Sequence, residues 1–286
     1  MSQYAITSTE VIDRLDVLKN LPTFSGLLTE YDRLLAKGAH IAEIVTLLRS
    51  DPRISTGLIK SANSARFNPG SKTIQDLGEA IALMGNRDIR LLIVTWNFYN
   101  LFHQKSPIQE TAYLQHSIVA AILAKNLAHT AEMTENDAFN MGLFHDIGVY
   151  LLALYAPEAI ESIQKATAGM ASRLTASEHS VFQLTHAHVG ARIAHKWQQP
   201  KSVIMGILGH HNPALVKRPY QPGARLCAVA QAGAFYCGYD NGLVGDTPGK
   251  VSDGTMRLLE RLKLTQSQYT QACQQSQQEA IDTGLL

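Results

Sequence analysis

The sequence is poor in cysteine. Its 286 residues contain three, Cys227, Cys237 and Cys273, and no Cys-x-x-Cys pair. Three cysteines at these spacings exclude the disulfide framework of a small secreted domain. We therefore expect all three to be small, buried apolar side chains.

An excess of charge of one sign is also lacking. Lys and Arg total 25 against 24 Asp and Glu, so the formal net charge is +1. No global field therefore favours nucleic acid or an anionic membrane. A charged fraction of 17% beside an apolar fraction of 45% excludes a disordered chain, and the length suffices to bury a core.

Long apolar runs are missing as well. The most apolar stretch, residues 91–94, is far too short to span a bilayer. Residues 1–21 contain Glu10, Asp13 and Asp16, and they lack a basic segment followed by an apolar core. The sequence therefore predicts no signal peptide here. We expect a cytoplasmic protein.

Helical periodicity is what the first hundred residues do show. Ile41, Ile44, Val45 and Leu48 recur on one face of a helix. The pair Asp51-Pro52 then predicts an N-cap and a first helical residue.

A second pair of helices is predicted around a glycine. Residues 76–79 resemble a capping box that opens a short helix. Gly85-Asn86 should end it, and a long apolar helix should follow to about Phe102.

Helical segments continue along the chain, at about 108–130, 135–147, 157–168, 175–197, 200–210 and 222–238. After a Gly-, Asp- and Pro-rich loop, a last helical pair starts near Met256. No alternating run of Val, Ile or Thr is long enough for a strand, so the prediction is an all-α fold.

We expect three parts in this all-α chain. The first is an N-terminal helical subdomain over 1–105, which ends near Lys105-Ser106-Pro107. The second is a helical subdomain over 106–238, and the third is a C-terminal loop with helices over 239–286 that packs on the core.

Histidine is unevenly distributed. Nine of the eleven histidines lie between positions 116 and 211. The informative ones are His116, the adjacent pair His145-Asp146, His186 with His188, and the doublet His210-His211. One such histidine alone is most often a hydrogen-bonded core residue. Several with an adjacent His-Asp pair, on separate predicted helices, indicate a metal site in a helix bundle.

The adjacent His-Asp pair constrains the local structure. Imidazole nitrogen and carboxylate oxygen are both ligands of first-row metals, and a carboxylate can bridge two ions. Neighbours on a helix point about 100° apart, so both reach one ion only near a helix end or facing a cleft. We expect Gly148 to provide that end.

These motifs resemble a known family. His116-Ser117, the segment Gly142 to Gly148 and His210-His211 are similar to the HD superfamily of metal-dependent phosphohydrolases, and more narrowly to its HDOD branch. The resemblance covers roughly residues 18–215. Further matching segments are Leu21-Pro22, Asp51-Pro52, residues 61–65, Ala80-Ile81, residues 83–85, Glu178, His186, residues 189–191, Trp197 and Pro200.

The resemblance implies a fold and a set of site residues. The fold is an N-terminal helical bundle packed on an HD-like helical subdomain. The implied metal ligands are His116, His145, Asp146, His186, His210 and His211. We take His186 as the ligand because it precedes Gly190 by four residues; the second shell or pocket would hold Glu178, His188, Gln231 and Arg192. The cofactor would be a divalent transition metal (Fe, Mn, Zn or Ni), as one ion or two, or none if the cluster is a relic.

Three departures from the HD pattern bear on activity. Gln231 stands where HD enzymes have a later Asp, and Val149 stands where HD-GYP enzymes have a phosphate-binding Lys. After His211 the chain reads Asn-Pro-Ala-Leu and has no Gly-Tyr-Pro loop.

We therefore favour a non-enzymatic module of bacterial signal transduction with a retained metal cluster. Its partner would be a signalling protein or a small nucleotide ligand, with no membrane involved.

A metal-dependent phosphohydrolase acting on a nucleotide or phosphomonoester is the alternative. In it Asp146 would bridge or orient the attacking water, and His210 or His211 would protonate the leaving group.

A third hypothesis is a nucleic-acid-binding regulator with a helix-turn-helix, in which Arg87 and Arg90 contact the phosphates of the nucleic acid. The balanced charge and the apolar content of residues 91–102 disfavour it.

Overall fold

The computed structural model describes residues 25–70, 72–102 and 106–286. Within these ranges every regular element is a helix, which confirms the all-α prediction. One isolated β-bridge, between Met170 and Gly245, joins two loops. The predicted Leu21-Pro22 motif and the boundary residue Lys105 lie outside the described residues. None of the described helices combines the length and apolar character that crossing a membrane requires.

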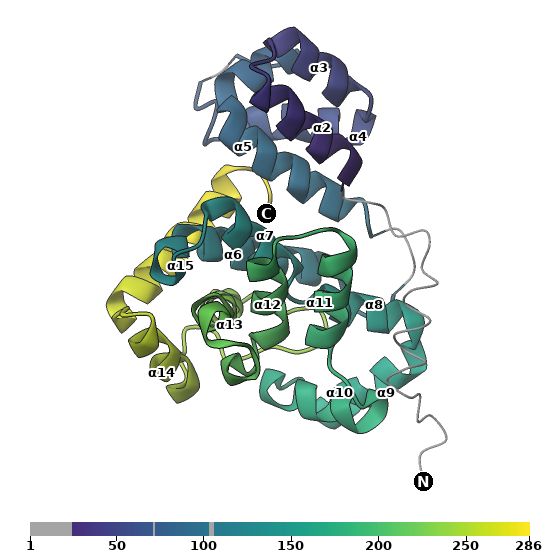
Figure 1. Cartoon of the computed structure of the whole chain (residues 1–286), viewed down its shortest axis with the longest axis vertical. Coiled ribbons are helices and arrows are strands. Elements are labelled where there is room, and N and C mark those ends of the chain that lie inside the picture. The colour runs from purple at the N-terminus through teal and green to yellow at the C-terminus, as the bar shows by residue number, and fades with distance from the viewer. Residues whose placement is uncertain (1–24, 71, 103–105) are drawn as a thin grey trace. The chain divides into compact units, whose positions relative to one another are not determined.

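The chain forms two compact units, and the described residues of the smaller one are 25–70, 72–102 and 278–286. Its helices, purple to blue in Figure 1, are α2 (Ser25–Ala36), α3 (Ile41–Arg49), α4 (Pro52–Ala62) and α5 (Leu77–Tyr99). The predicted cap is present: the Asp51 carboxylate accepts hydrogen bonds from the backbone of Arg53 and Ile54, at 2.9 and 3.2 Å.

The predicted break at Gly85 is also found. Gly85 has φ +75°, which interrupts the helical path and leaves α5 kinked at that point.

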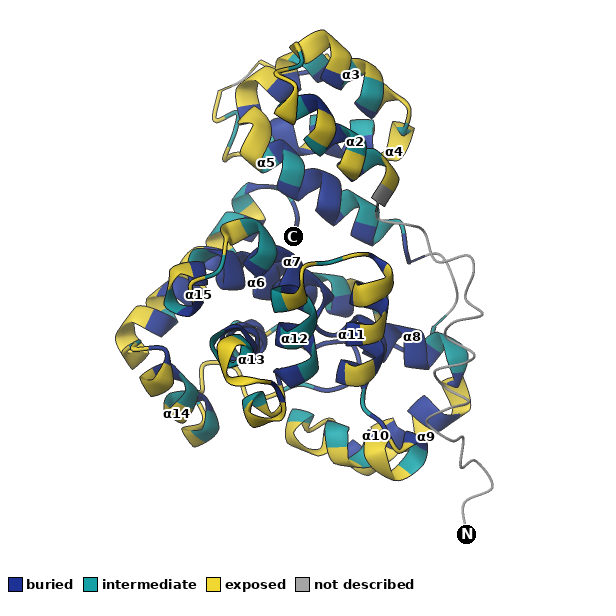
Figure 2. Cartoon of the chain, viewed as in Figure 1, coloured by how far each residue is buried: buried dark blue, intermediate teal, exposed yellow. Residues whose placement is uncertain are grey.

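The described residues of the larger unit are 106–277. It contains α6 (Glu110–Asn126), α7 (Glu135–Phe144), α8 (Ile147–Tyr155), α9 (Pro157–Thr167), α10 (Leu174–Phe182), α11 (His186–Lys196), α12 (Lys201–Gly209), α13 (Gln221–Tyr236), α14 (Asp253–Arg261) and most of α15 (Gln266–Asp282). Helices α6, α7 and α8 are buried over most of their length (dark blue in Figure 2), so they form the core of this unit.

Two predicted helices have the wrong boundaries. The segment 175–197 is two helices, α10 and α11, because Gln183 has φ +56° and ends the first one. Gly148 does not end a helix: α7 ends at Phe144, and α8 begins at Ile147 and contains Gly148. Helix α8 was not predicted from the sequence, because it is apolar on all sides and therefore shows no amphipathic period.

Two glycines allow neighbouring helices to approach closely. A Cβ at Gly142 of α7 would lie 2.6 Å from the Ala120 carbonyl oxygen of α6. A Cβ at Gly148 of α8 would collide with the backbone of His186 at the start of α11. The pairs α6–α7 and α8–α11 therefore pack backbone to backbone. Four candidate ligands lie on these helices or at their ends, and His210 and His211 follow at the end of α12.

We predict that Gly142→Ala destabilises the fold. The added methyl group has no space against α6, and overpacking of this kind costs about 1–3 kcal/mol. Gly254→Ala is the matched control, because the nearest atom to its Cβ is 3.6 Å away and the position is helical. Urea unfolding should show a loss of stability for the first variant only; equal stability of the two variants would contradict the close packing.

Candidate metal centre

Each candidate ligand is delivered by a helix or a helix end. His116 lies in the middle of α6, and His186 is the first residue of α11. His145 is the C-cap of α7 and Asp146 is the N-cap of α8. The chain turns between two helices at this pair, and so both side chains reach one pocket. The principle behind the Gly148 prediction holds, but the helix end lies three residues earlier.

The inner hydrogen bonds of the rings fix their tautomers. Nδ1 of His116, His145 and His210 donates to the carbonyl oxygen of Tyr239, Gly142 and Ile207, at 2.8, 2.7 and 2.6 Å respectively. A carbonyl oxygen only accepts, so Nδ1 must carry the proton in each ring. The Nε2 atom of each neutral ring then presents a lone pair.

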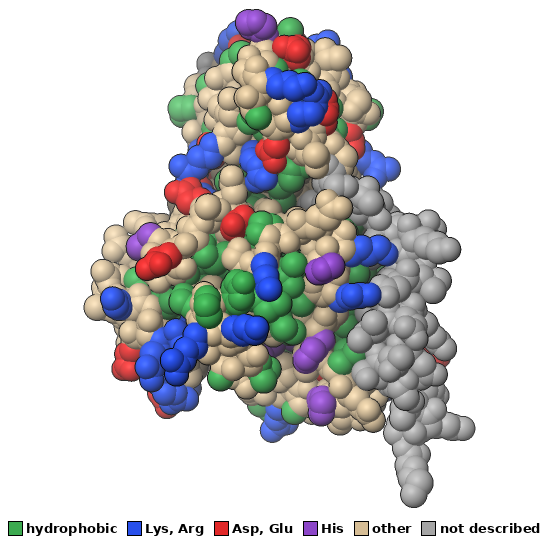
Figure 3. Space-filling model, in the orientation of Figure 1, with side chains coloured by type: hydrophobic (Ala, Val, Ile, Leu, Met, Phe, Trp, Pro, Cys, Tyr) green, Lys and Arg blue, Asp and Glu red, His purple; other side chains and the backbone are tan. Residues whose placement is uncertain are grey.

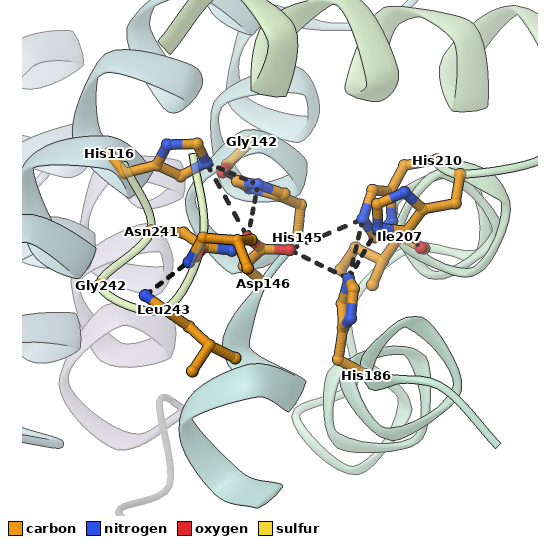
Figure 4. A network of polar contacts seen from close by, with 12 residues as sticks. His116, Gly142, His145, Asp146, His186, Ile207, His210, Asn241, Gly242 and Leu243 are labelled. Carbon is orange, nitrogen blue, oxygen red and sulfur yellow. Dashed lines mark hydrogen bonds and ion pairs between the residues drawn. The ribbon is translucent and has the colours of Figure 1, made fainter. Parts of the chain in front are cut away.

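These Nε2 atoms converge on each other and on Asp146 (Figure 4). The Nε2 atoms of His116 and His145 are 3.3 Å apart, as are those of His186 and His210. His211 Nε2 lies 2.8 Å from His186 Nε2.

The two oxygens of Asp146 face different imidazoles. Oδ2 lies 3.4 Å from Nε2 of His145 and 3.9 Å from that of His116. Oδ1 lies 3.2 Å from Nε2 of His186 and 3.6 Å from that of His210. Asp146 therefore stands between two groups of histidines.

Burial and neighbouring charge set the protonation of this pocket. Burial alone would raise the pKa of Asp146, but His145 and His186 outweigh it and hold that pKa well below its usual range. Burial lowers the pKa of His116 and of His210 to about 4. For His186 burial also opposes the charged form, but Glu178 and Asp146 raise its pKa to about 10.

This arrangement fits a metal ion. Two imidazole lone pairs 3.3 Å apart repel each other unless a cation lies between them, and Asp146 Oδ1 is buried without accepting a hydrogen bond. Rings whose Nδ1 donates to a carbonyl or carboxylate are typical metal ligands. Two groups have ligand atoms within 4.8 Å of one another: His116, His145 and Asp146, and Asp146, His186, His210 and His211.

A loop after α13 completes the pocket, and the sequence analysis did not identify it. The Asn241 side chain donates to Asp146 Oδ2 at 2.7 Å, and its own oxygen accepts from the backbone of Leu243 and Val244. Tyr239 supplies the carbonyl that fixes His116. The Asp-Asn-Gly run at 240–242 signals a turn, but nothing in it indicates a contact with an aspartate 95 residues away.

The other predicted pocket residues lie as follows. Glu178 accepts from His186 Nδ1 at 2.8 Å and from its backbone N–H at 3.0 Å. His188 is exposed, outside both ligand groups, and its Nδ1 accepts from the Thr185 backbone N–H at the start of α11. Arg192 is exposed on α11.

Gln231 is buried on the inner side of α13. It lies one turn from Cys227 and one turn from Phe235. The Phe235 ring is 4.6 Å from that of His116, and burial together with the Asp146 charge raises the pKa of Cys227. This face of α13 therefore borders the cluster.

Comparison with known proteins places this chain among helical HD-type proteins. The HDOD domain family matches residues 21–213. An uncharacterised protein from Treponema pallidum (strain Nichols) is 26% identical over 227 residues, which is 78% of this chain and 43% of that protein. The chain thus spans less than half the length of this relative.

Two solved structures show the same fold. A candidate phosphohydrolase from Shewanella amazonensis SB2B has a TM-score of 0.73 at 20% identity, covering 96% of this chain and 97% of its own. A candidate signal transduction protein from Marinobacter aquaeolei VT8 has a TM-score of 0.69 at 18% identity, covering 100% of this chain and 60% of its own. At these identities the likeness concerns the fold alone.

We predict that two ion-binding positions exist and that they can be separated by mutation. His116→Asn should remove one equivalent of bound Zn²⁺ or Mn²⁺, because it belongs to only one ligand group. His188→Asn, an exposed histidine outside both groups, is the control and should retain both equivalents. Elemental analysis after dialysis measures this; equal metal content in the two variants would contradict the assignment of His116.

We also predict that Asn241→Ala weakens metal binding without removing a ligand. Loss of the hydrogen bond that orients a ligating carboxylate typically lowers metal affinity about 10–100-fold. Asn68→Ala, which likewise removes an asparagine side-chain hydrogen bond but lies in the smaller unit, should leave the affinity unchanged. Competition with a chromogenic chelator gives both affinities, and identical values would show that Asn241 does not support the site.

Proposed function

This chain belongs to the HDOD family, and we propose that it works as a non-enzymatic regulatory module of bacterial signal transduction whose His/Asp cluster holds divalent transition metal ions. The ions would serve to tie helices together. Fe, Mn, Zn and Ni all suit a site of imidazoles and one carboxylate.

Burial of the ligands carries this proposal. His116, His145, Asp146 and His186 are 0% exposed, His210 is 2% exposed, and His211 alone is exposed. The site draws together α6, the α7–α8 junction, α11 and the end of α12, which are distant in sequence. A metal ion held there contributes its binding free energy to folding. It also supplies the positive charge that the converging lone pairs and Asp146 require.

Features that would bind a phosphate are weak at this site. Val149, which stands in place of the HD-GYP lysine, is buried in α8. Gln231 offers an amide where HD enzymes have a carboxylate, and Arg192 is exposed on α11.

We infer that the signal reaches the module through a signalling protein or a small nucleotide. The relative from Marinobacter aquaeolei, named as a candidate signal transduction protein, supports this inference. Nucleic acid is disfavoured by the net charge of +1. On the face shown in Figure 3, moreover, Lys and Arg side chains lie in separate small groups and form no continuous band.

A phosphohydrolase is the second candidate, and one observation favours it. His211 is the exposed residue of the ligand set, while its Nε2 lies 2.8 Å from that of the buried His186, so the cluster comes nearest to solvent at this residue. Asp146 would then orient a water, and His210 or His211 would donate a proton to the leaving group. The Shewanella relative named as a candidate phosphohydrolase is consistent with this alternative.

The two functions are separated by one pair of measurements. Under our proposal, metal at about 100 times its Kd raises the free energy of unfolding by about 3 kcal/mol, and this gain disappears in Asp146→Asn. The same metal-loaded protein should hydrolyse bis-p-nitrophenyl phosphate no faster than Asp146→Asn does. Turnover with Mn²⁺ or Fe²⁺ that is lost in this variant would favour the phosphohydrolase.

A further inference from the structure

Two of the three cysteines lie together, and their surroundings differ. The Cys237 thiol, at the end of α13, donates to the Cys273 carbonyl oxygen of α15 at 3.5 Å. A Cβ at Gly233, one turn before Cys237, would lie 3.0 Å from Cys273 Sγ. Both thiols therefore occupy the same contact between α13 and α15. The sequence predicted that all three cysteines are buried. This prediction is wrong for Cys237, which is only half-buried, whereas Cys227 and Cys273 are buried.

The two thiols are also unequal in acidity. The Cys273 thiol donates a hydrogen bond that lowers the pKa of Cys237, whereas the same bond and then burial raise the pKa of Cys273. Cys237 is thus the accessible, more acidic thiol, and Cys273 is the protected neighbour beside it.

We propose that Cys237 and Cys273 form a reversible redox pair, which a hydroperoxide oxidises to an intramolecular disulfide. The Cys237 thiolate attacks one oxygen of hydrogen peroxide; an S–O bond forms, the O–O bond breaks, and the other oxygen leaves as hydroxide, which takes a proton from solvent to become water. Cys273 sulfur then attacks the sulfenic sulfur of Cys237; an S–S bond forms and the S–O bond breaks with loss of a second water. Two electrons pass from the two sulfurs to the peroxide; an added dithiol then reduces the disulfide back to two thiols and is itself oxidised to a disulfide.

The position of this pair connects it to the cluster. Cys237 precedes Tyr239 and Asn241, whose contacts hold His116 and Asp146. On α15, Gln277 lies one turn after Cys273 and donates to the Tyr239 hydroxyl at 3.2 Å. A disulfide would add a covalent bond to this contact and restrict the opening of the loop. We expect metal to leave the oxidised protein several-fold more slowly; this second step rests on the proposed metal centre, and the disulfide itself does not.

The experiment treats the metal-free, full-length chain with hydrogen peroxide and counts thiols after denaturation. The count should fall from three to one, and peptide mapping should find a Cys237–Cys273 crosslink that dithiothreitol removes. Cys227→Ser, the matched control, should form the same crosslink, while Cys237→Ser should not. In Cys273→Ser, dimedone should trap the sulfenic acid at Cys237.

Two results would overturn the pairing: three thiols that persist at every peroxide concentration, or crosslinks that join only separate chains. Metal release into excess chelator is then compared for reduced and oxidised protein. An unchanged rate in protein whose thiols have paired overturns the link to the cluster. A chain that binds no metal contradicts the proposed function while the thiol count still tests the redox pair.

Discussion

Five imidazole rings turn the same nitrogen, Nε2, toward one buried carboxylate, and this convergence is the constraint on which the rest of the structure depends. The inner nitrogens of His116, His145 and His210 are committed to backbone carbonyls, so their lone pairs cannot turn away. Without a positive charge between them such lone pairs repel each other. A proton on His186, held there by Glu178 and Asp146, satisfies part of this requirement in the metal-free protein. Metal ions would satisfy the rest.

The close packing of helices in the larger unit brings these imidazole rings and the Asp146 carboxylate together. Gly142 lets α7 approach α6, and Gly148 lets α8 approach the start of α11. The loop after α13, which carries Tyr239 and Asn241, then completes the pocket through its contacts with His116 and Asp146. Because five of the six candidate ligands are buried and the Nδ1 atoms of four of the rings donate to protein groups, the geometry is better suited to holding helices together than to exchanging substrate. This is why we favour a regulatory module over an enzyme.

The sequence predicted the helical class and the residues that gather at the site. The resemblance to the HD pattern, which places a ligand four residues before Gly190, favoured His186 over His188; the structure puts His186 in the pocket and His188 in the first turn of the same helix. The boundaries were less predictable: α8 has no amphipathic period, and Gln183 takes a left-handed conformation that its residue type does not signal. Asn241 was missed because its contact with Asp146 spans 95 residues and arises only from tertiary packing. Its role as a metal-site support, like the ligand roles themselves, stays a prediction.

Anomalous diffraction from crystals of the metal-loaded protein tests the central claim most directly. We expect two peaks at the absorption edge of the metal, one beside Nε2 of His116 and His145 and the other beside Nε2 of His186, His210 and His211. Asp146 should lie between them, with one oxygen toward each. Peaks elsewhere in the chain, or a loaded protein with no peak at Asp146, would contradict it.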